Sequence, residues 1–83
     1  EEALDNGSYL FSGRLEVSYL NEKYNLVIPE GDYHTLSGYL VNTAENIPEQ
    51  GAVLELGEYR FVLDLVSNTR IETVRIEPIN IEN

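Results

Sequence analysis

The spacing of glycine and proline divides this 83-residue chain into short segments. Such residues stand at Gly7, at Gly13, in 29–31, in 48–51 and at Gly57. Because glycine and proline favour turns over regular structure, each interval has room for one short helix or strand. The chain is therefore restricted to several short elements packed around one core.

The first half of the chain predicts one strand and two helices. The apolar run 8–12 lies between two glycines and is typical of a buried or half-buried strand. Apolar residues recur at helical spacing in 16–24, which predicts an amphipathic helix ending near Asn25. The apolar stretch 26–28 is expected to pack across the core. A second helix is predicted over 36–44, with Thr35 as its N-cap.

The second half switches to alternating periodicity and predicts a three-stranded antiparallel meander. Its strands are expected at 52–56, 59–66 and 70–76, and the loop Gly57-Glu58 suits a type II′ hairpin turn. One face of the middle strand is expected to carry Tyr59, Phe61, Leu63 and Leu65. The alternation slips in the last strand, which predicts a bulge near Glu72 or Thr73.

These elements predict an α+β fold, in which two helices pack on a small antiparallel sheet built from the N-terminal strand and the C-terminal meander. A chain of 83 residues has room for one domain, so 1–83 is interpreted as a single domain. Residues 1–4 are expected to be a linker and 78–83 a tail. The chain lacks methionine and is interpreted as a piece of a longer protein.

Six residues are interpreted as structural markers. Thr35 is the predicted cap, and the others serve turns or close packing; the set is Gly7, Gly13, Thr35, Gly38, Pro48 and Gly51. Gly38 lies inside the second predicted helix, where glycine costs about 1 kcal/mol relative to alanine. Close approach of a neighbouring backbone is the simplest compensation.

Charge excludes several classes of partner. The chain carries 15 acidic and 5 basic residues, a formal net charge of -10. The resulting negative field repels phosphate backbones and anionic headgroups, which argues against binding nucleic acid or a membrane surface. No apolar stretch approaches the roughly 20 residues of a membrane-spanning helix, so direct membrane insertion is not expected.

Few residues point to catalysis or to a bound cofactor. The chain has no cysteine and one histidine, His34, which lacks the partners of a metal or nucleophile site. No phosphate-binding glycine loop is present. The sequence therefore predicts neither an enzyme nor a cofactor. Weak candidates for a divalent cation are the loop acids Glu30, Asp32 and Glu49, since such cations prefer oxygen ligands.

Protein contact is the remaining class of function, and its candidate residues are cationic or aromatic. Arg14 follows the first predicted strand and is expected either to bind a ligand or a partner, or to hold carbonyls or an acid nearby. Tyrosine is enriched in contact surfaces, and three tyrosines are expected to be exposed. The predicted docking surface is thus Arg14, Tyr19, Tyr33 and Tyr39.

An ordered set of residues from about Asp5 to Ile76 resembles the CorC/HlyC transporter-associated domain. It comprises Asp5, Gly7-Ser8-Tyr9, Gly13-Arg14, Leu20-Asn21-Glu22, Thr35, Gly38, Pro48, Gly51, Tyr59-Arg60-Phe61 and Arg70–Arg75. Ser18, Glu45 and Ala52 depart from the family pattern. The resemblance implies an α+β arrangement similar to FAD-binding-like domains, without implying that FAD binds.

The resemblance also implies a function. Such domains follow a membrane region and a CBS pair in proteins associated with magnesium and cobalt efflux. This chain is accordingly expected to be a non-catalytic regulatory domain on the cytoplasmic side of the membrane. Its expected partners are the CBS pair and membrane domain of its own parent chain, or a second copy in a homodimer. The alternative is a ligand-sensing domain that binds a divalent cation or a small molecule.

Overall fold

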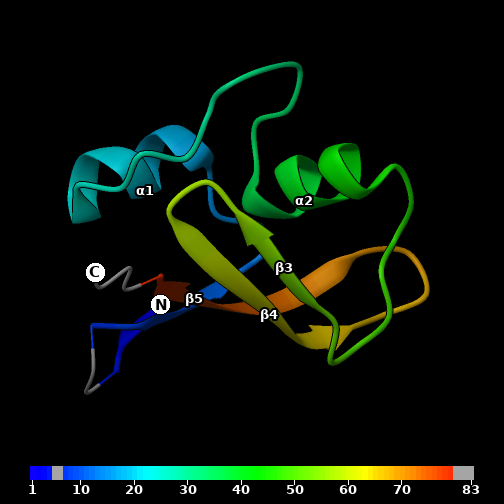
Figure 1. The fold of residues 1–83 in the computed structure, drawn as a ribbon. Coiled ribbons are helices and arrows are strands. Elements are labelled where there is room, and N and C mark those ends of the chain that lie inside the picture. The colour runs from blue at the N-terminus through cyan, green and yellow to red at the C-terminus, as the bar shows by residue number, and fades with distance from the viewer. Residues whose placement is uncertain (5–6, 80–83) are drawn as a thin grey trace.

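The computed structural model describes residues 1–4 and 7–79 and has the predicted α+β architecture. Both helices lie on one side of an antiparallel sheet (Figure 1). The elements are β1 (Glu2–Ala3), β2 (Tyr9–Ser12), α1 (Val17–Tyr24), α2 (Leu36–Ala44), β3 (Val53–Leu56), β4 (Tyr59–Val66) and β5 (Ile71–Pro78). In space the strands follow the order β1-β2-β5-β4-β3.

β2, the strand predicted in 8–12, lies between β1 and the last strand, β5. Phe11 lies opposite Val74, and Ser12 lies opposite Thr73. β3, β4 and β5 form the predicted meander. At the hairpin between β3 and β4, Gly57 has a φ of 60°, as the first position of a type II′ turn requires.

The two ends of the chain differ from the sequence-based expectation. Residues 1–4 were expected to be a linker, but Glu2 and Ala3 pair with β2 as a short edge strand. Pro78, placed in the predicted tail, is the last residue of β5, and the backbone N–H of Ile79 donates to Glu58 at 2.9 Å. The other residues of that tail, 80–83, lie outside the described residues. Backbone pairing with distant segments holds Glu2, Ala3, Pro78 and Ile79, and local sequence does not reveal it.

Two irregularities interrupt the pairing of β4 with β5. Leu63 lies opposite Val74 and Leu65 opposite Thr73, so β4 has an extra residue, Asp64. Val66 then lies opposite Ile71, so the next extra residue, on β5, is Glu72. The predicted bulge near Glu72 is thus confirmed. The irregularity at Asp64 was not predicted.

The bulge at Asp64 corrects the expected face of Leu65. Residues that alternate along a strand share a face, so Leu65 was expected to point inward with Leu63. The extra residue reverses the alternation. Leu63 is fully buried, whereas Leu65 is 52% exposed, and Val66 packs against the core instead.

The helices begin and end where the local signals indicate. Asn25 stops α1 in the left-handed conformation, with φ of 57°. Thr35 caps α2, because its Oγ1 accepts a hydrogen bond from the Gly38 backbone N–H at 3.1 Å. The apolar stretch after α1 also behaves as predicted. Ile28 is buried, and both its backbone N–H and its carbonyl bond the side-chain amide of Asn21.

We expect Thr35→Ala to lower the free energy of unfolding by about 1 kcal/mol, because the cap at Gly38 is lost. Chemical denaturation of the two proteins measures the difference. Thr43→Ala is a matched control, since its hydroxyl donates to the Tyr39 carbonyl within the same helix and caps nothing. Equal stability of Thr35→Ala and the wild type would contradict the capping role.

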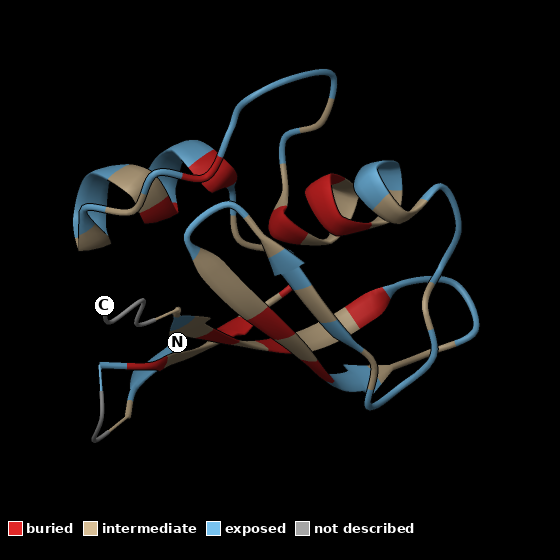
Figure 2. Cartoon of the chain, viewed as in Figure 1, coloured by how far each residue is buried: buried red, intermediate tan, exposed pale blue. Residues whose placement is uncertain are grey.

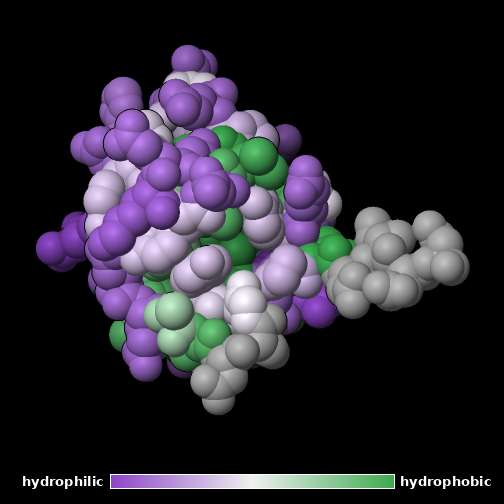
Figure 3. All heavy atoms as spheres, turned by 90° about the vertical axis from the view of Figure 1, so that its left-hand side faces the viewer, coloured by the Kyte–Doolittle hydropathy of each residue, from purple (hydrophilic) through white to green (hydrophobic). Residues whose placement is uncertain are grey.

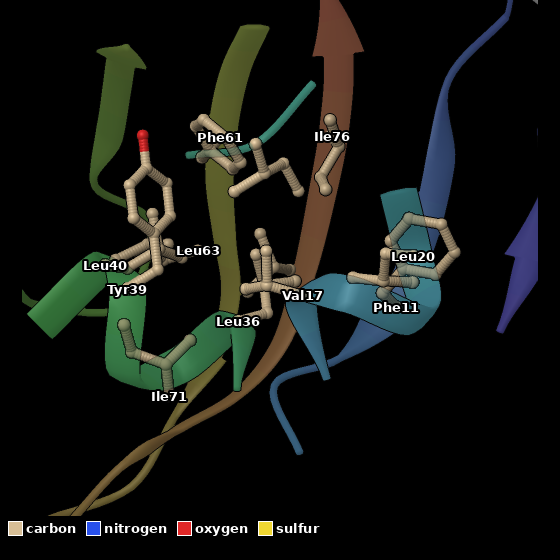
Figure 4. Packing of buried hydrophobic residues seen from close by; sticks show 12 residues of the cluster. Phe11, Val17, Leu20, Leu36, Tyr39, Leu40, Phe61, Leu63, Ile71 and Ile76 are labelled. Carbon is tan, nitrogen blue, oxygen red and sulfur yellow. The ribbon is translucent and has the colours of Figure 1, made fainter. Parts of the chain in front are cut away.

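The core lies between the helices and the inner face of the sheet (Figures 2 and 4). Its buried members are Phe11, Val17, Leu20, Ile28, Leu36, Tyr39, Leu40, Phe61, Leu63, Ile71, Val74 and Ile76. Aromatic rings extend it: Tyr9 stacks on Phe11 with ring centroids 5.4 Å apart, and Tyr39 meets Phe61 edge-on at 5.8 Å. Among the residues that the structure describes, no helix covers the other face of the sheet (Figure 1).

Candidate functional site

The starts of the two helices are joined by backbone hydrogen bonds, and this junction positions the candidate site. The N–H groups of Leu36 and Ser37 donate to the carbonyls of Leu15 and Gly13, both at 2.9 Å. The N–H of Val17 donates to the His34 carbonyl at 2.8 Å. Helix N-termini leave backbone N–H groups without partners inside the helix, and carbonyls in the turn before α1 accept from two of those at the start of α2.

Gly13 is buried at the centre of this junction. Its N–H donates to the Glu72 carbonyl at 2.8 Å, where β5 bulges. A Cβ on Gly13 would stand 2.2 Å from the Ile71 carbonyl oxygen, which is closer than atoms can approach. Gly38 differs from its expected role: a Cβ there would meet the Tyr33 and Thr35 side chains at 3.1 and 3.2 Å, rather than a backbone.

A pocket of about 370 Å³ opens beside this junction. We call it the Arg14–Arg70 pocket, after the two exposed arginines among its lining residues. The full lining is Gly13, Arg14, Thr35, Ser37, Gly38, Val41, Arg70 and Ile71. The pocket therefore lies where the loop between β2 and α1 meets the start of α2 and the start of β5.

Of the four predicted docking residues, Arg14 lines the pocket and the three tyrosines lie elsewhere. Tyr19 is on the outer side of α1 and is 36% exposed. Tyr33 is half-buried and donates to the Pro29 carbonyl at 2.6 Å. Tyr39 is 7% exposed and belongs to the core, so its predicted exposure is wrong. Its ring packs between Tyr33 and Phe61, and burial raises the pKa of its hydroxyl.

Tyr19 takes part in a polar cluster that connects the first residue to α1. The Glu1 carboxylate accepts hydrogen bonds from the hydroxyls of Tyr24 and Tyr19 and from Lys23 Nζ, the last two at 2.9 Å. These donors, Tyr24 foremost, lower the pKa of Glu1 from an ordinary value of 4.5 to about 2. The hydrogen bonds to Tyr19 and Glu1 raise the pKa of Lys23, and the hydrogen bond to Glu1 raises the pKa of Tyr24. We call this the Glu1 cluster.

The lowered pKa of Glu1 predicts a small pH-dependent contribution to stability. A carboxyl whose pKa falls on folding stabilises the fold above its unfolded value, and this contribution is lost as the pH falls from 4.5 through about 2. We expect Glu1→Gln to melt slightly below the wild type at pH 7 and at the same temperature near pH 2. Glu2→Gln, the same change on the adjacent residue, is the control. A difference that persists unchanged at pH 2 would contradict the prediction.

The predicted cation ligands are not brought together. Glu30 and Asp32 are exposed between the helices, and Glu49 is exposed in the turn after α2. His34 is exposed, and its carbonyl rather than its ring takes part in the helix junction. Among residues 1–4 and 7–79, no three acidic or histidine side chains gather in a way that could hold a cation.

The second candidate surface is the side of the sheet away from the helices, which we call the open face. Register and burial assign to it Leu10, Ser12, Val53, Glu55, Arg60, Val62, Leu65, Thr73, Arg75 and Glu77. Val53 and Leu65 are 51% and 52% exposed, so two large apolar side chains of this face are accessible to solvent. The contribution of Leu65 was not predicted, because Leu65 was expected on the apolar face of β4 with Leu63.

The charges of the open face pair with one another. Arg60 lies between Glu55 and Glu77 across three strands, with its Nε 3.0 Å from Glu55 Oε2 and its Nη1 3.5 Å from Glu77 Oε1. Arg75 Nε lies 3.0 Å from Glu77 Oε2. Two carboxylates thus offset two guanidiniums. By contrast, the side of the molecule that carries α1 shows mainly hydrophilic side chains with small separate apolar areas (Figure 3).

Sequence reasoning identified Arg14 but missed Arg70 and the open face. Arg70 was expected only as part of the last strand and of the family resemblance, and the pairing of β2 with β5 brings the two arginines to one pocket. The open face depends on the bulge at Asp64.

Among the described residues, no helix is long and apolar enough to cross a bilayer.

The sequence matches known proteins over nearly its whole length. A family model described as a transporter associated domain, CorC_HlyC, matches residues 2–80. The UPF0053 inner membrane protein YfjD of Escherichia coli K12 is 29% identical over 75 residues. The match covers 90% of this chain but 18% of that protein, so the chain corresponds to a small part of a longer membrane protein.

Solved structures share the fold. A CorC_HlyC transporter associated domain from a Xylella fastidiosa hemolysin, in complex with Mg²⁺ and Mn²⁺, matches with a TM-score of 0.80 and 26% identity, over 94% of this chain and 95% of that one. The transporter associated domain of a CBS domain protein from Porphyromonas gingivalis matches with a TM-score of 0.79 and 28% identity, over 95% and 97%. The chain belongs to the CorC_HlyC family of transporter associated domains.

Proposed function

We propose that this domain is a non-catalytic regulatory module of a membrane transporter for divalent cations, and that it acts by docking its open face on the rest of its parent chain. The observation that carries the proposal is the open face itself, where exposed Val53 and Leu65 accompany a balanced set of charges. Exposed apolar side chains gathered on one face are typical of contact surfaces.

The rest of the parent chain is the partner that the observations favour. The matched relative is more than five times as long as the region shared with this chain, since that region is 18% of it. A neighbour of the same fold comes from a CBS domain protein, which makes a CBS pair one candidate for the docked part. Such a module would sit at the cytoplasmic side of the membrane.

Charge also favours contact through the open face. The chain carries a formal net charge of -10, so most of its surface repels another acidic protein. On the open face, Arg60 and Arg75 offset Glu55 and Glu77, so approach there meets less repulsion. Docking that is stronger in one state of the transporter would shift its conformational equilibrium.

The test is to place acid on the open face of the full-length protein. We expect the double variant Val53→Glu/Leu65→Glu to change cation efflux, because the added charge would have to be desolvated on docking. Val27→Glu is the matched control, since Val27 is 58% exposed and does not belong to the open face. Efflux by the double variant equal to that of the control would overturn the proposal.

The isolated domain separates docking from other effects. Val53 and Leu65 are half-exposed, so the double variant should keep the far-UV circular dichroism of the wild type. A homodimer through the open face is the competing outcome, and sedimentation equilibrium detects it. Self-association of the wild-type domain that the double variant abolishes would replace the parent chain by a second copy as the partner.

A further inference from the structure

The Arg14–Arg70 pocket shares no residue with the open face, so docking through the open face leaves the pocket without a role. It lies on the helix side of the sheet, because α2 residues and the buried Ile71 line it. Its volume of about 370 Å³ falls within the range of small-molecule sites, roughly 300–1,000 Å³. The pocket is therefore a second, separate surface feature.

The inner wall of the pocket is mainly apolar. Its two hydroxyl groups, on Thr35 and Ser37, accept backbone hydrogen bonds and keep their O–H groups as donors. Thr35 Oγ1 accepts from the Gly38 N–H at 3.1 Å, and Ser37 Oγ accepts from the Ile71 N–H at 3.3 Å. The Ser37 N–H is bonded to Gly13. What remains toward the pocket is mainly hydrocarbon, including the Val41 and Ile71 side chains.

The two arginines give this apolar wall a positive margin. Arg14 and Arg70 are exposed, and within residues 1–4 and 7–79 neither guanidinium lies within 4.0 Å of a carboxylate. The other three cations, Lys23, Arg60 and Arg75, each lie 2.9–3.0 Å from a glutamate. The chain carries 15 acids, yet the margin of this pocket holds two arginines that form no ion pair among the described residues. The margin is therefore locally positive.

We infer that the Arg14–Arg70 pocket binds a carboxylate attached to an apolar group. The apolar part would enter against Val41 and Ile71, while the carboxylate would meet the guanidiniums at the margin. Arginine pairs well with carboxylates because its planar donors match both oxygens. The site gives the ligand-sensing alternative a definite location and takes an anion rather than a cation.

A phosphate fits the site less well. Proteins cradle phosphates with free backbone N–H groups, commonly at a helix N-terminus. At the start of α2 the N–H groups of Leu36, Ser37 and Gly38 already bond Leu15, Gly13 and Thr35. The apolar wall would also gain nothing from inorganic phosphate. The two ligand classes therefore differ in expected affinity.

The carboxylate has two sources, a free organic acid or an acidic side chain of a peptide, and the probes distinguish them. The ¹⁵N-labelled domain is titrated with hexanoate, with acetyl-Leu-Glu-Leu-amide, with hexanol and with inorganic phosphate, at about 50 mM salt to limit screening. We expect saturable shifts of the Gly13, Gly38 and Ile71 amides with hexanoate or the peptide. The tighter of these two identifies the source, and hexanol and phosphate should bind at least about fivefold more weakly.

Charge variants test the role of the arginines. Arg14→Gln and Arg70→Gln should each lower the affinity for the carboxylate about fivefold, the size expected for the loss of one exposed ion pair. Arg60→Gln removes the same charge from the open face and should leave the affinity unchanged. The amide shifts of the wild type need no variant and remain informative if one fails to fold.

Three results would overturn the inference. One is the absence of saturable shifts with both carboxylates up to tens of millimolar. Another is phosphate or hexanol binding as tightly as hexanoate, which would remove the need for a joined apolar group and carboxylate. The third is equal affinity in Arg14→Gln, Arg70→Gln and Arg60→Gln, which would show that general charge rather than the pocket attracts the anion.

Discussion

Replacing Gly13 by alanine is expected to destabilise the domain by about 3 kcal/mol or more, because the new methyl group has no space. It would stand 2.2 Å from the Ile71 carbonyl oxygen and 3.1 Å from the Ser37 Cβ. To relieve this clash, the loop between β2 and α1 would have to move away from β5. That movement would strain the Gly13 bonds to Glu72 and Ser37, which align the sheet with α2. Urea denaturation of both proteins measures the loss.

Gly38→Ala is the matched control for Gly13→Ala. A methyl group there meets side-chain atoms at 3.1 and 3.2 Å, a tight but adjustable contact. Alanine in a helix gains about 1 kcal/mol over glycine, which offsets that crowding. We expect its stability to lie within about 1 kcal/mol of the wild type. If Gly13→Ala were as stable as Gly38→Ala, that result would contradict the close packing of Gly13, in the loop between β2 and α1, against Ile71.

Leu63→Ala is expected to lower the free energy of unfolding by about 2–5 kcal/mol, the cost of removing a fully buried leucine side chain. Leu63 is 0% exposed between the sheet and the helices (Figure 4). The same substitution at Leu65 should cost less than about 1 kcal/mol, because that side chain is 52% exposed on the open face. The two residues stand on one strand, two positions apart.

This pair of variants tests the bulge at Asp64 directly. Regular alternation would place Leu63 and Leu65 on the same face and would predict similar losses. The bulge predicts very different losses, and thermal or chemical unfolding resolves them easily. Val66→Ala completes the comparison, since Val66 packs against the core in the place that alternation assigns to Leu65. Equal losses at Leu63 and Leu65 would show that β4 is regular.

Much of the fold was predictable because its signals are local. Thr35 caps α2 and Asn25 ends α1, and both effects arise within a few residues. The turn at Gly57 joins β3 to β4 because glycine adopts a positive φ without strain. The slip in alternation within β5 indicates the bulge at Glu72 from the sequence alone.

The candidate sites were less predictable. Arg14 was recognised as a candidate, but its convergence with Arg70 requires β2 to lie against β5, a pairing between opposite ends of the chain. Tyr39 was expected to be exposed, yet it is buried and the ring of Tyr33 packs against it. Leu65 looked buried, and one extra residue on β4 turned it outward.

The amino-acid sequence by itself determined the two helices and the approximate extents of β2, β3, β4 and β5, since hydrophobic period, capping and turn chemistry act over a few neighbouring residues. The edge strand β1 and the end of β5 at Pro78 were not predicted. Tertiary structure alone decided the position of β2 beside β5, the outward direction of Leu65 and the meeting of Arg14 with Arg70. The physical reason is that register and strand order are chosen by contacts between distant segments. A shift of one residue in such contacts moves side chains from the core to the surface.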